Sequence, residues 1–191
     1  MNLLGVASFM QRHYNLEGIF FSGASGGAWA ALLLASNEDL EAALATLIEE
    51  APKCCVGRTL CGAYGVYDVG MSMVYNIIFK GKDLPPIING RLAIPVTRLT
   101  WKILNCPLVP LIPIGVPIPY PYLKDEVISH FNSNDDIFQC IVASALIPFA
   151  LNGRPFVPYR DWWMCVDAGM TNIYFYIFYI IHCSYFIYHY F

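Results

Sequence analysis

The chain has 191 residues and a net charge of −3, from eleven Lys and Arg against fourteen Asp and Glu. One domain with a sizeable core is therefore possible, and a basic surface for nucleic acid is not expected. Hydrophobic residues make up 57% and charged residues only 13%, which excludes intrinsic disorder. The seven cysteines are odd in number and have no zinc-finger spacing, so free thiols in a reducing, cytoplasmic or peripheral-membrane location are expected rather than secretion.

The N-terminal part of the chain predicts helices around one short strand. Apolar residues from Leu3 to Met10 have the spacing of a helix with one buried face, and the apolar run Gly18–Ser22 suits a buried strand. A glycine-rich turn then leads into a helix over 28–35, rich in Ala and Leu. A further helix, with a periodic apolar face, is expected to begin at Ser36 or Asn37.

The remainder of the chain continues to alternate between expected strands and helices. Pro95 indicates that its strand lies at an edge or carries a bulge, and the six prolines of Cys106–Tyr122 exclude a helix there. This alternation predicts an α/β fold with a mostly parallel sheet. The expected elements are a short helix over Met71–Phe79, strands over Arg91–Thr97 and Glu126–Phe131, a helix over Asp135–Ser144 capped by Asn132, Ser133 or Asn134, and a strand over Trp162–Val166.

Ser25 is the strongest candidate for chemistry. It lies between Gly23 and Gly27, at the junction of the expected strand and helix, in the G-x-S-x-G pattern of a nucleophile elbow. Small neighbours are needed because the turn is tight, and both glycines are expected to let strand and helix approach closely. The hydroxyl would then stand at a helix N-terminus, where the Gly26 N–H can donate to an oxyanion. An ordinary glycine-rich turn is the alternative.

Asp167 is the second candidate. It follows the expected strand Trp162–Val166, and the carboxyl ends of strands are where α/β proteins place their sites. Ala168 and Gly169 make a tight turn after it. A turn-starting aspartate without a chemical role is the alternative.

These two motifs and a third one between them resemble the patatin-like phospholipase family. The elbow runs from Gly23 to Ala28, the segment Ala143–Pro148 has the form A-S-x-x-I-P, and Asp167 begins a variant of the D-G-[GA] motif. The resemblance covers about residues 3–172 and includes the strands expected over 91–99 and 126–131.

The resemblance implies a three-layer α/β/α sandwich and a Ser-Asp dyad without histidine, metal or cofactor. Ser25 would be the nucleophile and Asp167 the base, with Gly23, Gly26 and Gly27 forming the elbow and one oxyanion donor. The implied activity is lipid acyl hydrolysis, on fatty-acyl esters of phospholipids or glycerolipids at a membrane or lipid-droplet surface, through an acyl-enzyme. Ser144 is expected to tolerate replacement by alanine.

The chain departs from the family pattern in two places. The family's glycine-rich loop before the first helix is not found upstream of Leu3, so the oxyanion hole is expected to be half built and the activity weak. Ala168 replaces the first glycine of the D-G-[GA] motif, which is expected to strain the turn. The competing function is therefore a catalytically impaired, membrane-associated fragment of the same fold.

Two domains of different character are expected, an acyl hydrolase domain over 1–172 and an aromatic tail over 173–191. The tail holds six Tyr, four Phe and five Ile, with no charged side chain. Its length would span roughly 28 Å as a helix, close to a bilayer core. A membrane anchor, a buried strand and a translated non-coding stretch are the alternatives. His182 within the tail allows a further one, a Ser25, Asp167 and His182 triad.

Overall fold

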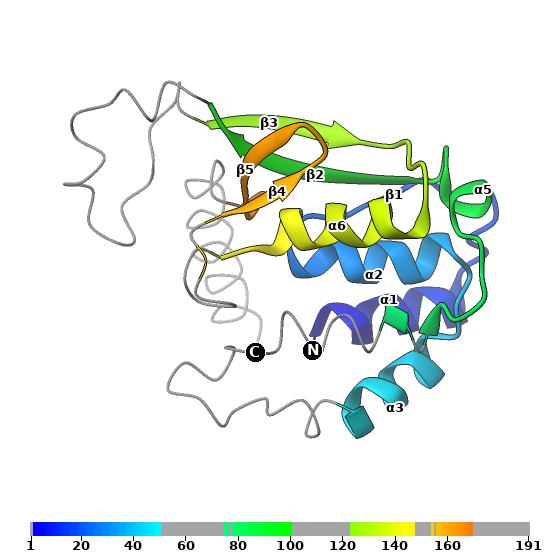
Figure 1. The fold of residues 1–191 in the computed structure, drawn as a ribbon. Helices are drawn as coiled ribbons and strands as arrows, with labels where there is room; N and C mark the ends of the chain where they lie inside the picture. Colours follow the sequence, from blue (N-terminus) through cyan, green and yellow to red (C-terminus); the bar gives the residue numbers. More distant parts are fainter. Residues whose placement is uncertain are drawn as a thin grey trace, which may run out of the picture.

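A computed structural model of the chain describes residues 2–50, 75–76, 78–100, 123–147, 154 and 156–169, which combine helices with an open mixed sheet (Figure 1). The mixed α and β class expected from the sequence is confirmed. The elements are α1 (Asn2–His13), β1 (Phe21–Ser22), α2 (Gly26–Ala35), α3 (Leu40–Glu50), α5 (Pro85–Ile88), β2 (Leu92–Leu99), β3 (Leu123–Ile128), α6 (Asn134–Ala145), β4 (Val157–Tyr159) and β5 (Trp162–Val166).

The strand directions differ from the mostly parallel sheet that the sequence predicts. β1 pairs with β2 in parallel, whereas β2 with β3, β2 with β5 and β4 with β5 all pair antiparallel. The β4–β5 connection shows the physical reason, because only Arg160 and Asp161 separate these strands. A connection this short joins antiparallel strands, since a parallel pair needs a crossover of a dozen or more residues.

β2 is the strand around which the sheet is organised. β3 pairs with it along Ile94–Leu99, so β5, which pairs with Thr97 and Arg98, must take the opposite edge. β1 pairs with the beginning of β2, and the contact between Ser25 and Asp167 puts β1 on the same edge as β5. β1 and β5 therefore run toward each other along one edge of β2, and their carboxyl ends meet.

Pro95 lies at this meeting point. The Gly23 N–H donates to the Ala93 carbonyl at 3.3 Å, and the next rung of the parallel ladder would require an N–H on Pro95, which proline lacks. β1 leaves the sheet at that position. The prediction that Pro95 marks an edge strand or a bulge is wrong, since β2 is central and its register with β3 is unbroken from Ile94 to Leu99. A central strand can carry proline where one of its partners ends and the next has not begun.

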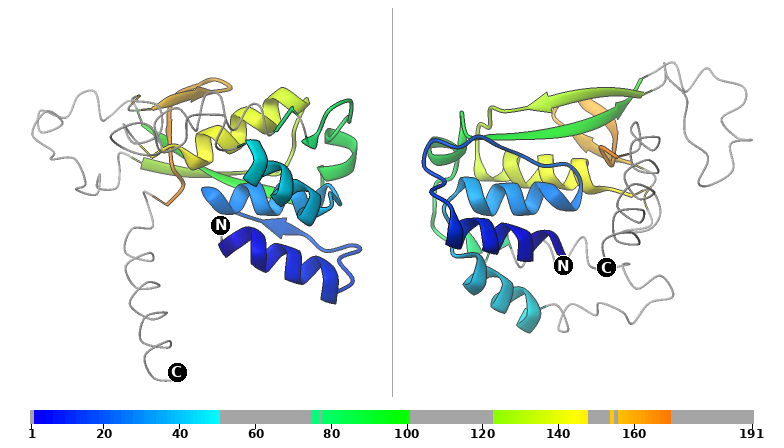
Figure 2. Two further views of the ribbon diagram at one scale, coloured as in Figure 1. Left: turned by 90° about the horizontal axis from the view of Figure 1, so that it is seen from below. Right: turned by 180° about the vertical axis from the view of Figure 1, so that it is seen from behind.

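The helices pack against the sheet and against one another (Figures 1 and 2). α6 and α2 lie next to the strands, α1 lies along α2, and α3 lies beyond. α2 is buried from Ala28 to Ala35, because it carries no polar side chain there and has neighbours on all sides. Gln11 joins α1 to α3, donating to the Glu38 carbonyl at 2.6 Å and accepting from the Leu40 N–H at 3.1 Å.

The helix starts agree with the sequence in part. Ser133 caps α6 as expected, with its hydroxyl accepting from the Asp136 N–H at 3.1 Å. For α3, however, the Asp39 carboxylate accepts the first free N–H groups, and Ser36 instead ends α2.

The other predicted elements have different outcomes. β3 begins at Leu123, three residues before the strand expected from Glu126. The proline-rich segment, most of Met71–Phe79 and the tail over 173–191 lie outside the described residues.

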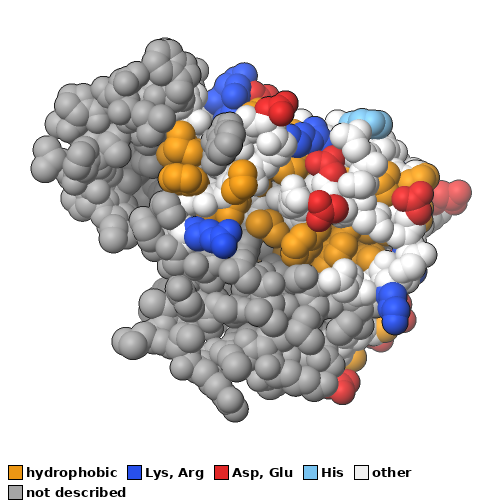
Figure 3. Space-filling view, viewed as in Figure 1, with side chains coloured by type: hydrophobic (Ala, Val, Ile, Leu, Met, Phe, Trp, Pro, Cys, Tyr) orange, Lys and Arg blue, Asp and Glu red, His pale blue; other side chains and the backbone are white. Residues whose placement is uncertain are grey.

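Charged side chains of both signs are interspersed on the face shown in Figure 3. Arg160, in the β4–β5 turn, pairs with Asp136 at the beginning of α6 at 2.7 Å.

Across the described part of the chain, no helix has both the length and the apolar character needed to cross a membrane.

Candidate active site

Ser25 occupies a sharp turn between β1 and α2. Its backbone has φ 53° and ψ −130°, a region that L-residues rarely enter and that costs on the order of 1–3 kcal/mol. The residue directly precedes the first residue of α2, so the turn projects its side chain from the beginning of a helix. A strained serine at a strand-to-helix turn is the geometry of a nucleophile elbow, as the sequence predicts.

The two glycines of the elbow have different roles. A Cβ on Gly23 would lie 2.2 Å from the Gly27 carbonyl oxygen and 2.5 Å from its carbon. A Cβ on Gly27 would meet no heavy atom within 4 Å. Only Gly23 is therefore required for the close approach of strand and helix, which corrects the expectation that both are.

Replacing Gly23 by alanine is expected to lower the free energy of unfolding by at least about 3 kcal/mol, because backbone atoms must move to admit the methyl group. Gly27→Ala is the matched control, since it adds the same methyl group in open space and changes stability by no more than about 1 kcal/mol. Chemical denaturation of both variants measures the difference. Equal losses of stability would show that the steric requirement at Gly23 is wrong.

Asp167 directly follows β5 and faces the elbow with both carboxylate oxygens engaged. Oδ2 accepts the hydrogen bond of the Ser25 hydroxyl, and Oδ1 accepts from the Gly169 N–H at 2.7 Å. The residue is 7% exposed. The structure therefore brings together the two residues that the sequence singles out, 142 positions apart in the chain, with the aspartate oriented by its own turn.

The burial of Asp167 raises the pKa of its carboxyl above the ordinary value, because a charged carboxylate is poorly solvated there. The hydrogen bonds from Ser25 and from the Gly169 N–H act in the opposite direction and favour the charged form. A carboxylate whose pKa is raised toward neutral pH is a stronger base than an exposed aspartate, which suits it to accept a proton from a hydroxyl.

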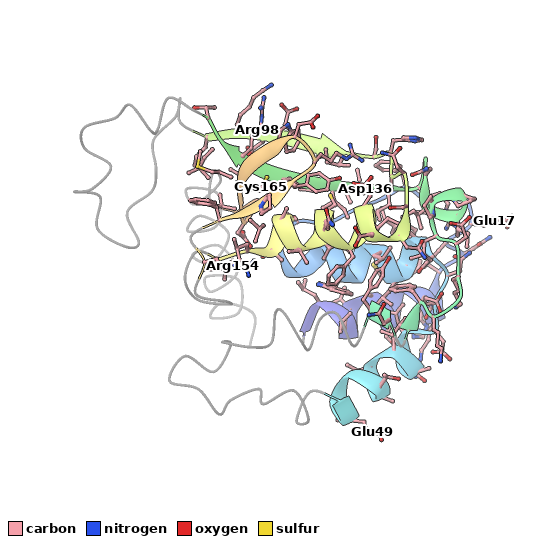
Figure 4. The ribbon with its side chains drawn as sticks, viewed as in Figure 1. Glu17, Glu49, Arg98, Asp136, Arg154 and Cys165 are labelled. Carbon is pink, nitrogen blue, oxygen red and sulfur yellow. The ribbon has the colours of Figure 1, made fainter. Side chains whose placement is uncertain are left out.

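Helix α6 holds β5 in place at both ends. At its beginning, Asp136 pairs with Arg160 of the β4–β5 turn, and Figure 4 shows Asp136 at this end of the helix. Beyond the last turn of α6, the Leu146 carbonyl accepts from the Asp167 N–H at 2.8 Å. Carbonyls at a helix C-terminus have no partner within the helix, so they are free to bind a neighbouring segment.

Ala168 fits this arrangement without strain. Its N–H donates to the Ser144 carbonyl at 2.9 Å. Of the non-glycine residues that the structure describes, positive φ angles occur at Ser25, Asn37 and Arg160, and Ala168 is not among them. The expectation that alanine strains the turn is wrong, because Ala168 does not take the positive φ that would favour glycine.

Ser144 is the residue of this site whose role the sequence did not predict. Its hydroxyl donates to the Pro95 carbonyl at 2.7 Å and accepts from the Ser25 N–H at 3.1 Å. The serine belongs to the A-S-x-x-I-P segment Ala143–Pro148, whose pattern indicates a resemblance to a family but no role for this residue. Nothing in that pattern indicates that a serine 119 positions from Ser25 would touch it.

Gly26 directly follows Ser25 and is the first residue of α2. The next two N–H groups, of Gly27 and Ala28, donate to the carbonyls of Ala24 and Ser25 at 2.8 and 3.0 Å. For the exposed Gly26 N–H, no acceptor is found among the described residues. A free N–H at a helix N-terminus is suited to stabilise negative charge on a substrate oxygen.

Neither histidine in the described residues interacts with this pair. His13 packs against Phe9 at the end of α1, His130 is exposed after β3, and His182 lies outside the described residues. Within the same part of the chain, no three His, Cys, Asp or Glu side chains gather as metal ligands. Comparison with protein-family models, with curated proteins and with solved structures finds no match to this chain.

Proposed function

We propose that this chain is a lipid acyl hydrolase of the patatin-like type, which cleaves fatty-acyl esters through a Ser25-Asp167 dyad. The observation that carries the proposal is the hydrogen bond from the Ser25 hydroxyl, at a strained elbow, to the buried carboxylate of Asp167. The three-layer α/β/α arrangement of that family, with helices on both faces of the sheet, belongs to the same proposal.

The dyad supplies the proton transfers of a two-step ester hydrolysis. As Ser25 Oγ attacks the carbonyl carbon, its proton passes to Asp167 Oδ2 and the carbonyl oxygen becomes an oxyanion facing the Gly26 N–H. Collapse of this intermediate breaks the ester bond, and Asp167 returns the proton to the departing alcohol. Water then attacks the acyl-enzyme, giving its proton to Asp167, and the fatty acid leaves as the proton returns to Ser25.

An apolar surface beside the elbow supports a fatty-acyl substrate. Leu3, Val6 and Phe9 are spaced along one side of α1, and each is more than half exposed. The Cδ1 atom of Leu3 lies 4.0 Å from the position that a Cβ on Gly26 would take, so this surface begins at the elbow. An exposed apolar surface next to the elbow would suit contact with an acyl chain better than contact with a small polar substrate.

The test combines a serine-directed fluorophosphonate probe with p-nitrophenyl esters of increasing acyl length. We expect the probe to label Ser25, as located by peptide mass spectrometry, and turnover to increase from acetate to longer acyl chains. Phospholipid vesicles then test release of free fatty acid. If the folded chain shows neither labelling nor turnover, the hydrolase proposal is wrong and the impaired fragment is favoured.

The pH dependence of hydrolysis should report the raised pKa of Asp167. The base acts only when deprotonated, so kcat/KM should fall as the pH decreases through its pKa, at a pH above the ordinary aspartate value of about 3.9. A pH profile of a soluble short-chain ester measures this acid limb. An acid limb at or below the ordinary value would contradict the assignment of Asp167 as a buried base.

A further inference from the structure

We infer that Ser144 is a positioning residue of the dyad, which holds the backbone of Ser25 so that its hydroxyl meets Asp167. The inference rests on the proposed function. Ser144 lies in the last turn of α6 and is fully buried, and its hydroxyl lies between the nucleophile turn and β2.

The two hydrogen bonds of Ser144 leave its hydroxyl one orientation. A serine hydroxyl has a single proton to donate, and this proton points to the Pro95 carbonyl at 2.7 Å. A lone pair is then directed at the Ser25 N–H, 3.1 Å away. The result is a chain of hydrogen bonds from the nucleophile, through Ser144, to the central strand.

This chain of bonds spans the gap where β1 leaves the sheet. Ser25 is beyond the end of β1, so the ladder that holds Gly23 on Ala93 no longer holds Ser25. The Pro95 carbonyl belongs to the stretch of β2 between the ends of β1 and β5. The Ser144 hydroxyl therefore takes the place of a missing strand partner twice. It accepts from the Ser25 N–H and donates to the Pro95 carbonyl of β2.

The same turn of α6 also holds the other member of the dyad. The Ser144 carbonyl accepts from the Ala168 N–H and the Leu146 carbonyl from the Asp167 N–H. One rigid helix end thus contacts Ser25 through a side chain and Asp167 through its backbone. The separation of the two reacting groups then depends on the Ser144 hydroxyl, because it is the link between this helix end and the strained Ser25 backbone.

Removing the hydroxyl leaves the carbonyl of the half-buried Pro95 and the Ser25 N–H without their partner, and Ser25 is free to relax from its strained conformation. A displacement of about 1 Å at a reacting atom costs on the order of 10²-fold in rate. For Ser144→Ala we expect kcat on a soluble ester and the rate of fluorophosphonate labelling to fall by roughly that factor, with KM nearly unchanged.

Ser144→Cys and Ser144→Thr separate positioning from packing. Cysteine has almost the shape of serine but is a weak hydrogen-bonding group, whereas threonine keeps the hydroxyl and adds a methyl group to a fully buried site. Positioning by hydrogen bonds predicts that threonine retains more of the kcat per folded molecule than cysteine. A purely structural role predicts the reverse order, and that result would overturn the inference.

Cys140→Ala is the matched control, because it also removes one buried heavy atom from α6, one turn before Ser144. We expect it to lower the melting temperature about as much as Ser144→Ala while leaving kcat unchanged. Equal kcat losses in the two variants would show that Ser144 acts through stability alone. If the wild-type chain is not labelled at Ser25, the proposed function fails; if it is labelled and Ser144→Ala reacts equally fast, only the role of Ser144 fails.

Discussion

Replacing Ser25 by alanine is expected to abolish ester hydrolysis, with kcat reduced by about 10⁴-fold or more. The variant keeps the elbow and the Gly26 N–H but has no atom that can form the acyl-enzyme. Since the members of a catalytic unit act together, its loss removes the contribution of Asp167 as well. Turnover of a soluble p-nitrophenyl ester and fluorophosphonate labelling measure the effect.

Ser22→Ala is the matched control for this experiment. Ser22 is exposed at the end of β1, three positions before Ser25, and replacement there should leave both measurements close to those of the wild type. If Ser25→Ala retained most of its activity, Ser25 would not be the nucleophile, and the short-chain turnover would have to come from another group.

Replacing Asp167 by asparagine is expected to reduce kcat nearly as much as the loss of Ser25, by roughly 10⁴-fold. Asparagine has the same shape, and its side-chain oxygen can still accept from the Gly169 N–H. Its amide nitrogen would donate to the Ser25 hydroxyl, however, so it cannot take the proton that the attack releases. Asp161→Asn, at an exposed turn position, is the control that should keep full activity.

The same variant should be more stable than the wild type at neutral pH. Because burial raises the pKa of Asp167 in the folded protein, the folded state binds this proton more tightly than the unfolded state. The wild type therefore loses stability as the pH increases from the ordinary aspartate value of about 3.9 through the raised value, and Asp167→Asn does not. Thermal unfolding at pH values across this range measures the growing difference.

Replacing each histidine by alanine tests whether the hydrolysis needs a histidine. We expect His13→Ala, His130→Ala, His182→Ala and His189→Ala to keep their hydrolytic activity, since the Ser25 hydroxyl donates directly to Asp167. Activity lost in His182→Ala alone would replace the dyad by a triad.

The stability prediction for Asp167→Asn has its own contradicting result. A melting temperature of this variant below that of the wild type at all pH values would show that the Asp167 carboxylate is not destabilised by burial.

The sequence by itself determined most of the local elements and singled out the two residues, Ser25 and Asp167, that the structure joins by a hydrogen bond. The apolar periodicity of 28–35, the capping residues before α6 and the glycines around Ser25 are local signals, and each acts within a few residues of the structure that it specifies. Ser25 and Asp167 were predicted because each follows a strand, in a turn that itself requires the residue types around it.

Only the tertiary structure decided how these parts meet. Strand direction depends on which edges pair, so a local pattern could not show that β5 runs against β2, nor that Pro95 lies between the ends of β1 and β5. The requirement for Gly23 but not Gly27 depends on one distance across the elbow. Ser144 was expected to tolerate replacement because nothing near it in the sequence indicates a partner for its hydroxyl. Its hydrogen-bond partners, Ser25 and Pro95, lie 119 and 49 positions away in the chain. These contacts exist only once α6 has packed on the sheet.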